Sequence, residues 1–454
     1  MSNDVVRMIS ASGILGYGFP EESLKSGLAR NPHMIGVDGG SSDPGPHYLG
    51  SGKMFTNRLA VKRDMSLLLQ AAIAHKIPMI IGTCGGAGGE PHLQTCVEIL
   101  YEISREFNLH FKLATIHSEQ HKDWISAQLK QHKIHPLGFA PPLTTETISR
   151  AERIVGMMGP EPYFSALQNG AQVILAGRST DPAPWAALAM HHGMPPAPSW
   201  YAGKMLECGC NAAVPKGHDC LMASVGKDFV EVEPVNPERR CTPASVAIQA
   251  LHENASPTIH KEPGGILDTS ACEIKAHSDR SVRITGMQWL EQPYSIKLEA
   301  VEKAGYSAIT IAATRDPGLI GQLDSFISMI HDAVAVKVKA FNVKPEDYQL
   351  VFRLYGKDGV MGDWEPLKNT ISHEIAFLVE TVAQSQDIAN AVISVARVTL
   401  LHSDFPGRLC REGNMAFPFS PSDIERGAIY RFSMQHIVEP DNPLQMFPIQ
   451  YHQV

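Results

Sequence analysis

The stretch Pro78–His92, PMIIGTCGGAGGEPH, sets the fold class of this chain. Its apolar start has the length of a buried strand, and glycines interrupt it before a helical pattern begins. A strand that runs through a glycine-rich loop into a helix is the repeating unit of parallel α/β sheets. The glycine spacing does not fit G-x-G-x-x-G, so this unit carries no dinucleotide signature.

The same unit recurs along the first half of the chain. Apolar runs of strand length occur at Val5–Ala11, Met34–Val37, Lys112–Ile116, Arg153–Met157 and Gln172–Ala176. Helical periodicity occurs between them at Asn57–His75, Leu93–Phe107 and near Tyr163–Asn169. This alternation predicts an α/β fold whose N-terminal lobe is a parallel, Rossmann-like sheet with helices on both faces.

The second half is typical of an α+β lobe. After a strand or hairpin at Cys220–Val235, we expect a helix at Thr242–His252 capped by Thr242, strands at Ser295–Leu298, Ser307–Ala312 and Tyr348–Tyr355, and long helices at Gly318–Phe341 and Glu374–Leu400. The charged, proline-bearing stretch Pro234–Arg240 marks the boundary. The predicted domains are 1–235, with the glycine-rich ligand loops, and 236–454, an α+β lobe that closes the cleft.

Composition narrows the classes of function. The 454 residues carry a net charge of −8, which gives no basic surface for nucleic acid. No uncharged apolar run reaches the ~18 residues that span a bilayer, so we expect no membrane partner. The N-terminal stretch from Met1 to Pro20 lacks a basic n-region, and eight cysteines in so long a chain are expected to be reduced. We therefore expect a cytoplasmic protein.

The sequence shows no evident cofactor motif and no metal motif. His117 and His121 have H-x-x-x-H spacing but lack an obvious third ligand. Cys208 and Cys210 form C-x-C, which is not the spacing of a redox or zinc motif. We expect no metal and no cofactor, with CoA possible only as part of the substrate.

Three loops mark the expected ligand site. They are Asp38–Pro46, Gly82–Glu90 and Gly177–Pro182, and each follows an apolar run. Ligands of open parallel sheets bind beyond the carboxyl ends of the strands, so these loops predict a ligand cleft. The alternative is that each loop is simply a tight turn.

We predict that the second and third loops bind the anionic end of a substrate. Backbone N–H groups at a helix start favour an anion, and here they belong to Gly85, Gly86, Gly88 and Gly89. Arg178 adds a planar fork that suits a carboxylate or phosphate. Asp181 and Asn414 are further candidates for substrate binding.

Five residues are candidates for catalysis. Asp38 and Asp43 are close enough in sequence to share a pocket, where two carboxylates split their pKa values; alternatively, Asp43 starts a turn. Lys297 and Glu299 share one strand face, as an acid–base pair or as a bland ion pair. Cys84 is a reactive thiol if its pKa is lowered, or otherwise a buried and inert one.

Five segments resemble the acyclic terpene utilisation, or AtuA-like, family, formerly a domain of unknown function. They are ILAGRSTDP at Ile174–Pro182, EPGGILD at Glu262–Asp268, PYSIKLE at Pro293–Glu299, RLYGKDGVMG at Arg353–Gly362 and NMAFPFSPSD at Asn414–Asp423. The likeness extends from about residue 7 to residue 440. The run Gly39–Gly52 departs from the terpene-pathway pattern.

The resemblance implies a cytoplasmic enzyme of carboxylic-acid or acyl-CoA catabolism. For the family's namesake it implies a lyase acting on a 3-hydroxy-3-methylglutaryl-type CoA thioester. It supplies no catalytic residue, so the residue roles above come from chemistry alone.

Two hypotheses about function follow. The first is an enzyme with lyase, hydratase or isomerase chemistry on a small carboxylate or its CoA thioester, working as a homo-oligomer. The second is a non-catalytic subunit that needs a small partner protein to complete its site. An exposed apolar patch at residues 410–440 would favour the second hypothesis.

Overall fold

A computed structural model describes residues 5–454. Residues 1–4, which begin the predicted first domain and the stretch Met1–Pro20, lie outside the described residues. The chain divides into two compact units. Unit 1 comprises Met1–Glu302 and Phe432–Val454, and unit 2 comprises Lys303–Arg431. The division therefore falls between residues 302 and 303, inside the second predicted domain, and the C-terminal segment returns to unit 1.

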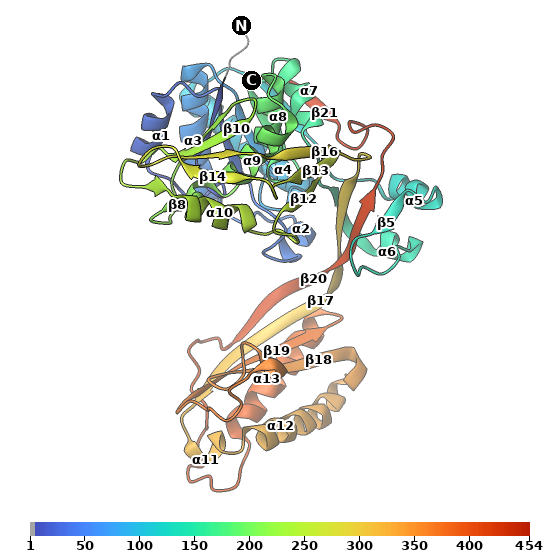
Figure 1. The fold of residues 1–454 in the computed structure, drawn as a ribbon. Helices are drawn as coiled ribbons and strands as arrows, with labels where there is room; N and C mark the ends of the chain where they lie inside the picture. The colour runs from blue at the N-terminus through green and yellow to red at the C-terminus, as the bar shows by residue number, and fades with distance from the viewer. Residues whose placement is uncertain (1–4) are drawn as a thin grey trace. The chain divides into compact units, whose positions relative to one another are not determined.

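A mixed sheet forms the centre of unit 1 (Figure 1). Its neighbouring parallel strands are β1 (Val6–Ser10), β2 (Met34–Asp38), β3 (Met79–Gly82), β7 (Val173–Ala176) and β4 (Lys112–Ile116). Each of these strands was expected from its apolar run. The predicted α/β class and parallel core are thus confirmed.

Antiparallel strands extend this sheet at both edges, which the alternation in sequence did not predict. Beyond β1 they are β9 (Leu221–Val225), β10 (Phe229–Pro234), β15 (Val282–Thr285) and β14 (Glu273–Ala276), and beyond β4 there is β21 (Ile449–Gln453). The hairpin β9–β10 matches the prediction for Cys220–Val235. A two-residue periodicity and short turns allow such pairing without crossover helices.

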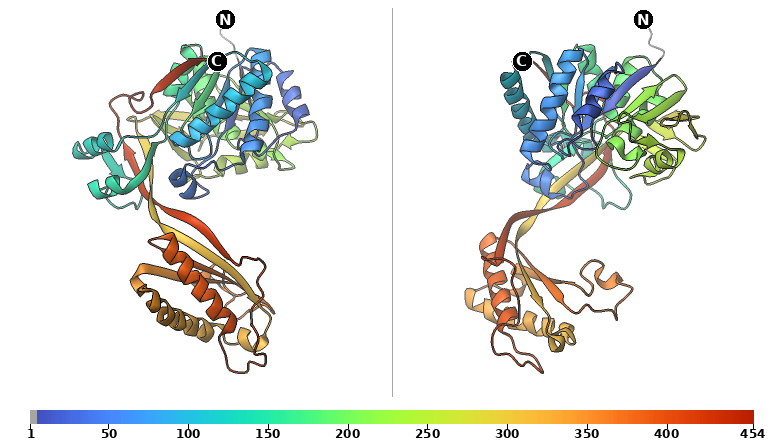
Figure 2. Two further views of the ribbon diagram at one scale, coloured as in Figure 1. Left: turned by 180° about the vertical axis from the view of Figure 1, so that it is seen from behind. Right: turned by 90° about the vertical axis from the view of Figure 1, so that its left-hand side faces the viewer.

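Alternate strand residues point to opposite faces of the sheet, so both faces of the parallel strands present apolar side chains. Helices cover both of these faces. In β3, Ile81 packs with α1 (Glu21–Leu28), α3 (Arg58–His75) and α4 (Glu90–Phe107). The next residue back, Ile80, packs with α7 (Glu161–Gln168), α8 (Ala183–His191) and α9 (Pro196–Leu206). Helices α3 and α4 lie side by side in both views of Figure 2.

The remaining elements of unit 1 are short. The helices are α2 (His47–Ser51), α5 (Lys122–Lys130), α6 (Thr145–Arg150), α10 (Pro243–Leu251) and a 3-10 turn at Gly209–Ala212. The strands are β5 (Ile134–Pro136), β6 (Ala151–Gly156), β8 (Ala213–Val214), β11 (Arg240–Cys241), β12 (Ile259–Glu262), β13 (Gly265–Asp268) and β16 (Gln288–Glu291). The predicted cap of α10 is confirmed, since Thr242 and Ser245 form a capping box.

Unit 2 packs helices against an antiparallel sheet. Its strands are β18 (Tyr348–Tyr355), β19 (Ile375–Ala383) and part of β17 (Ile296–Thr314), and its helices are α11 (Pro317–Ile320), α12 (Leu323–Val338) and α13 (Gln386–His402). Short 3-10 turns occupy Lys339–Phe341, Pro345–Asp347 and Gly362–Trp364. β20 (Asp423–Val438), like β17, contains residues of both units.

Three predictions for this region are wrong in part. Glu374–Leu400 is not one helix, because β19 with strictly alternating burial precedes α13. The two strands predicted at Ser295–Leu298 and Ser307–Ala312 are a single strand, β17. The helix predicted at Gly318–Phe341 is broken between α11 and α12 at residues 321–322. In each case the apolar content was recognised but its period or continuity was not.

Candidate functional site

The loops after β2, β3 and β7 meet at the carboxyl ends of these parallel strands, the carboxyl edge of the sheet. A Cβ atom added to Gly40 would lie 2.7 Å from the Cα of Gly86, and one added to Gly88 would lie 2.2 Å from the backbone nitrogen of Arg178. Only glycine permits backbones to approach so closely. The predicted convergence of the three loops is confirmed.

A buried ion-pair network joins this edge to β17. Glu299 accepts hydrogen bonds from Arg178 Nε at 3.1 Å and from Ser42 Oγ at 3.1 Å, and Lys297 Nζ lies 2.7 Å from its other oxygen. Arg178 Nη1 donates to Asp181 Oδ1 at 3.3 Å. The predicted placement of Lys297 and Glu299 against the loops of the first half is therefore confirmed.

The network holds its charges against burial. Only 4% of the Arg178 side chain and 3% of the Glu299 side chain are exposed. Burial by itself would raise the pKa of Glu299, but Arg178 and Lys297 lower it to about 2. Burial also opposes the charge of Arg178, yet Glu299 and Asp181 hold its pKa above the ordinary value. Both partners are ionised at neutral pH.

Other carboxyl groups at this edge shift in the opposite direction. Asp38 ends β2, is buried and accepts a hydrogen bond from Gly40 N at 3.2 Å. Burial, reinforced by Asp181, raises the pKa of Asp38 well above its usual range. Burial also raises the pKa of Asp181 to about 6, although Arg178 opposes the shift. A quarter of the Asp181 side chain, 25%, remains exposed and reachable by a ligand.

Sequence reasoning missed two further parts of the cluster. Glu262, the last residue of β12, accepts a hydrogen bond from Thr180 Oγ1 at 2.7 Å, and burial raises its pKa to about 7. At the end of α9, Lys204 pairs with Glu207 at 2.6 Å, and burial raises the pKa of Glu207 to about 8 against the pull of Lys204. A signal existed for Glu262 alone, because it opens the EPGGILD run.

The predicted anion cradle is largely occupied by the chain itself. The N–H groups of Gly86 and Gly88 donate to carbonyl oxygens of their own loop, both at 3.2 Å. At the start of α4, Glu90 N donates to the carboxylate of Glu119 at 2.8 Å. Arg178 is no free clamp either, since its nitrogens bind Glu299 and Asp181. The glycines, Gly85 and Gly89 included, therefore serve the close packing of the loops first.

Cys84 was a candidate nucleophile only if its pKa is lowered, and the shift runs in the other direction. The side chain is fully buried, and burial together with the neighbouring Cys96 thiol raises its pKa well above the ordinary value. A thiol that stays protonated is a poor nucleophile. The alternative interpretation, a small buried residue, accounts for Cys84.

Asp43 lies in the loop after β2, and its charge contributes to the raised pKa of Asp181. Asp43 is exposed, and its N–H donates to Ser41 Oγ at 3.2 Å, as expected for the turn interpretation. The partner that raises the pKa of Asp38 is thus Asp181, not Asp43. Asn414 belongs to unit 2, where its Nδ2 donates to the carbonyl of Ser403 at 2.9 Å.

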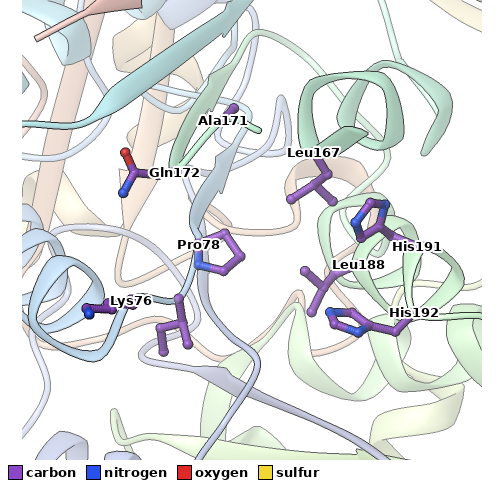
Figure 3. Close-up of a pocket in the computed structure, with 9 residues that line it drawn as sticks. Lys76, Pro78, Leu167, Ala171, Gln172, Leu188, His191 and His192 are labelled. Atoms are coloured by element: carbon purple, nitrogen blue, oxygen red, sulfur yellow. The ribbon is translucent and has the colours of Figure 1, made fainter. Parts of the chain in front are cut away.

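The cavity shown in Figure 3 lies at the other end of the parallel strands. Its volume is about 210 Å³, and its wall includes Pro78 and Gln172, which directly precede β3 and β7. His191 and His192 at the end of α8 complete one side. Because ligands of such sheets bind at the carboxyl ends, we do not assign this cavity to the candidate site.

Fold and site together define an α/β protein with a buried, carboxylate-rich site at the carboxyl ends of parallel strands. A family model described as "Acyclic terpene utilisation family protein AtuA" matches residues 52–418, and the chain belongs to this family. The resemblance drawn from the five segments is thereby confirmed. Neither the curated proteins nor the solved structures gave a match. None of the helices within residues 5–454 has both the length and the apolar character needed to cross a bilayer.

Proposed function

We propose that the chain is a catabolic enzyme that performs acid–base chemistry on a small carboxylate or its CoA thioester. The reaction classes that fit are lyase, hydratase and isomerase. The observation that carries the proposal is the buried carboxyl cluster around Arg178, which binds both Glu299 and Asp181. Glu299 is held near 2, whereas Asp181 is near 6 and Glu262 near 7. Such a split provides an acid and a base at neutral pH.

The roles follow from these values. Asp181 is mostly ionised at pH 7 and partly exposed, so it is the candidate general base. Glu262 is buried, has a raised pKa and is oriented by Thr180, so it is the candidate general acid. Arg178 and Glu299 act as positioning residues, because Arg178 fixes the Asp181 carboxylate. This assignment replaces Asp43 and Cys84 as catalytic candidates.

Lys297, rather than Arg178, is the residue that we expect to bind the anionic group of the substrate. Arg178 is almost fully enclosed, whereas 33% of the Lys297 side chain is exposed. An ammonium group that reaches solvent at the edge of the network can bind a substrate carboxylate without breaking a buried ion pair. Lys297 thus retains its predicted role beside Glu299.

Turnover of 3-hydroxy-3-methylglutaryl-CoA, with its free acid and CoA as comparisons, tests the proposal by mass spectrometry of the products. We expect Asp181→Asn and Glu262→Gln to lower kcat by about 100-fold or more, the usual contribution of a positioned acid or base. Glu291→Gln, on exposed β16 of the same unit, is the matched control and should leave kcat unchanged. Full activity in both site variants would refute the assignment.

A second candidate is a subunit that works only with a small partner. The observation in its favour is an exposed apolar segment in unit 2, where Val360 and Trp364 are each 84% exposed and Leu367 is 65% exposed. Within 410–440 the large exposed apolar residues are fewer, namely Phe419 and Phe432. Turnover by the purified chain alone would contradict this candidate.

A further inference from the structure

We propose that Cys208, His252 and Glu253 form a binding site for a divalent transition metal, with zinc as the best match. One ligand atom from each residue, a thiol sulfur, an imidazole nitrogen and a carboxylate oxygen, lies within 4.8 Å of the other two. No sequence motif predicts this site. His252 and Glu253 are adjacent, but Cys208 is 44 positions earlier and has C-x-C rather than C-x-x-C spacing.

The fold brings the three ligands together from two elements. Cys208 follows α9, and its carbonyl oxygen would lie 3.1 Å from a Cβ added to Gly13, just beyond β1. His252 and Glu253 end α10, where the chain turns and Glu253 adopts a left-handed conformation with φ of 58°. The thiol is thus anchored at the carboxyl edge of the sheet, and a helix end presents the other two ligands to it.

The donor set favours zinc over harder cations. Sulfur and nitrogen donors suit zinc and cobalt, whereas calcium and magnesium prefer oxygen alone. Zinc binds thiolate at about 2.3 Å and imidazole or carboxylate at about 2.0–2.2 Å, so its ligand atoms lie about 3–4 Å apart. His252 Nε2 and Glu253 Oε1 are already 3.1 Å apart. Three protein ligands leave a fourth position open, as in catalytic zinc sites.

Gln249 supplies an independent observation. Only 3% of this residue is exposed, and it lies one helical turn before His252 on the same side of α10. Its side chain hydrogen-bonds to Cys208. The amide is a weakly bound donor beside a neutral thiol, because a thiol sulfur is a weak acceptor. It suits a metal-bound thiolate, because N–H groups around a ligating sulfur orient and stabilise it.

The simpler alternative is a surface ion pair between His252 and Glu253. Their side chains are 43% and 46% exposed, which fits such a pair. A surface pair, however, does not account for the Cys208 thiol within reach of both groups. The exposure of His252 and Glu253 also gives a metal ion a path to the site.

The proposed site borders the carboxylate cluster. Cys208 directly follows Glu207, which pairs with Lys204 at the end of α9. A cation bound there would be a Lewis acid at the rim of the proposed substrate site, able to hold a carbonyl or carboxylate oxygen at its open position. The metal proposal does not depend on the proposed reaction, because metal binding can be measured without any substrate.

Titration of the purified full chain with Co²⁺, followed by displacement with Zn²⁺, tests the site. We expect one equivalent of Co²⁺ to produce thiolate-to-cobalt charge-transfer absorption, which one equivalent of Zn²⁺ removes. Cys208→Ser should abolish that band, and Gln249→Ala should weaken binding by about 10–100-fold, as the loss of a group that hydrogen-bonds to a metal ligand does. Cys410→Ser, which removes an exposed thiol of unit 2, is the matched control and should retain the band.

A second measurement avoids dependence on variants that fold poorly. In the unmodified chain, Zn²⁺ should protect Cys208 from alkylation by iodoacetamide, whereas Cys410 should react equally with and without the metal. Peptide mass spectrometry reads both sites in one sample. The proposal is overturned if Co²⁺ gives no charge-transfer band, if Cys208→Ser keeps the band, or if Zn²⁺ leaves the alkylation of Cys208 unchanged.

Discussion

Glu299 of unit 1 and Glu380 of unit 2 bind the same kinds of side chain, but these partners differ in how deeply they are buried. Glu299 binds Arg178, Lys297 and the hydroxyl of Ser42. Glu380 on β19 binds the side chains of Arg353, Arg426 and Ser307 with similar distances, between 2.8 and 3.0 Å. Each carboxylate therefore has two cationic partners and one serine.

The two clusters differ in the exposure of their cations. Arg178 and Lys297 are 4% and 33% exposed, whereas Arg353 and Arg426 are 42% and 48% exposed. Water screens the exposed pairs and can solvate either partner alone, but a buried charge depends on its partner. The comparison teaches that the partners of a carboxylate do not fix the strength of its cluster, because burial decides what the loss of a partner costs.

The largest expected effect is the loss of Glu299. Glu299→Ala leaves Arg178 buried without its main counter-charge, and breaking a buried pair costs about 3–5 kcal/mol. Urea unfolding followed by tryptophan fluorescence measures the free energy of unfolding of unit 1, because four of the five tryptophans belong to it. Glu380→Ala, followed by hydrogen exchange of β18 and β19, should cost about 1 kcal/mol or less. Equal losses in the two units would break the comparison.

The second effect is a pH dependence of the same buried pair. The pKa of Glu299 is lowered to about 2 in the folded state, against about 4.3 when unfolded. The folded state therefore binds fewer protons in this window, and the stabilisation present above pH ~4.3 is lost as the pH falls towards 2. The advantage of the native chain over Glu299→Gln should shrink by up to about 3 kcal/mol between these pH values.

Denaturant midpoints at pH 5, 4 and 3 measure this change. Glu380→Gln is the control, since the lowering of the Glu380 pKa comes from exposed arginines and should yield a smaller change. A constant gap between the native chain and Glu299→Gln across the acid range would show that Glu299 is not held ionised by its partners.

The sequence predicted the strands, loops and helices around this site better than the ion pairs within it. The strand–glycine–helix unit at Pro78–His92 and the cap at Thr242 depend on residues close in the chain, so their patterns were readable. Arg178 was correctly placed, but its partner Glu299 is 121 positions away, and no local pattern reveals that pairing. The arginine consequently looked free to bind a substrate.

The errors in unit 2 have a different origin. The run at Ile375–Ala383 is apolar at alternate positions and leads into Ala- and Val-rich α13, so one helix seemed to continue through both. Periodicity cannot separate a buried strand from a helix when the run is short. The partners of Ile375–Ala383 in β17 and β18, which fix it as a strand, are set by tertiary structure.

Glu262 also tests the effect of burial on a carboxyl group, but its pKa is raised whereas that of Glu299 is lowered. Among residues 5–454 its carboxylate forms no ion pair and accepts a hydrogen bond from Thr180, and burial raises its pKa to about 7. The folded state then binds more protons than the unfolded state between pH ~4.3 and 7, so stability is lost as the pH rises through this window. Glu262→Gln keeps an acceptor for Thr180 and removes the penalty.

The expected result is a gain at high pH. The free energy of unfolding of Glu262→Gln, minus that of the native chain, should be larger at pH 8 than at pH 4 by about 1–3 kcal/mol. Urea titrations at the two pH values measure this difference. A variant that is destabilised equally at both would mean that Glu262 is ionised and paired in the folded protein.

The smallest expected effect concerns the two serines, and it isolates the cause of the contrast. Ser42 donates to Glu299 at 3.1 Å, and Ser307 donates to Glu380 at 3.0 Å. A hydrogen bond to a charged group contributes about 1.5–3 kcal/mol, and each carboxylate keeps both cations when its serine is removed. Ser42→Ala and Ser307→Ala should therefore cost similar amounts, within about 1 kcal/mol of each other, by urea unfolding and hydrogen exchange respectively. If Ser42→Ala instead approached the cost of Glu299→Ala, the hydroxyl rather than the buried charge pair would hold the loop to β17, and the contrast between the two units would need a different explanation.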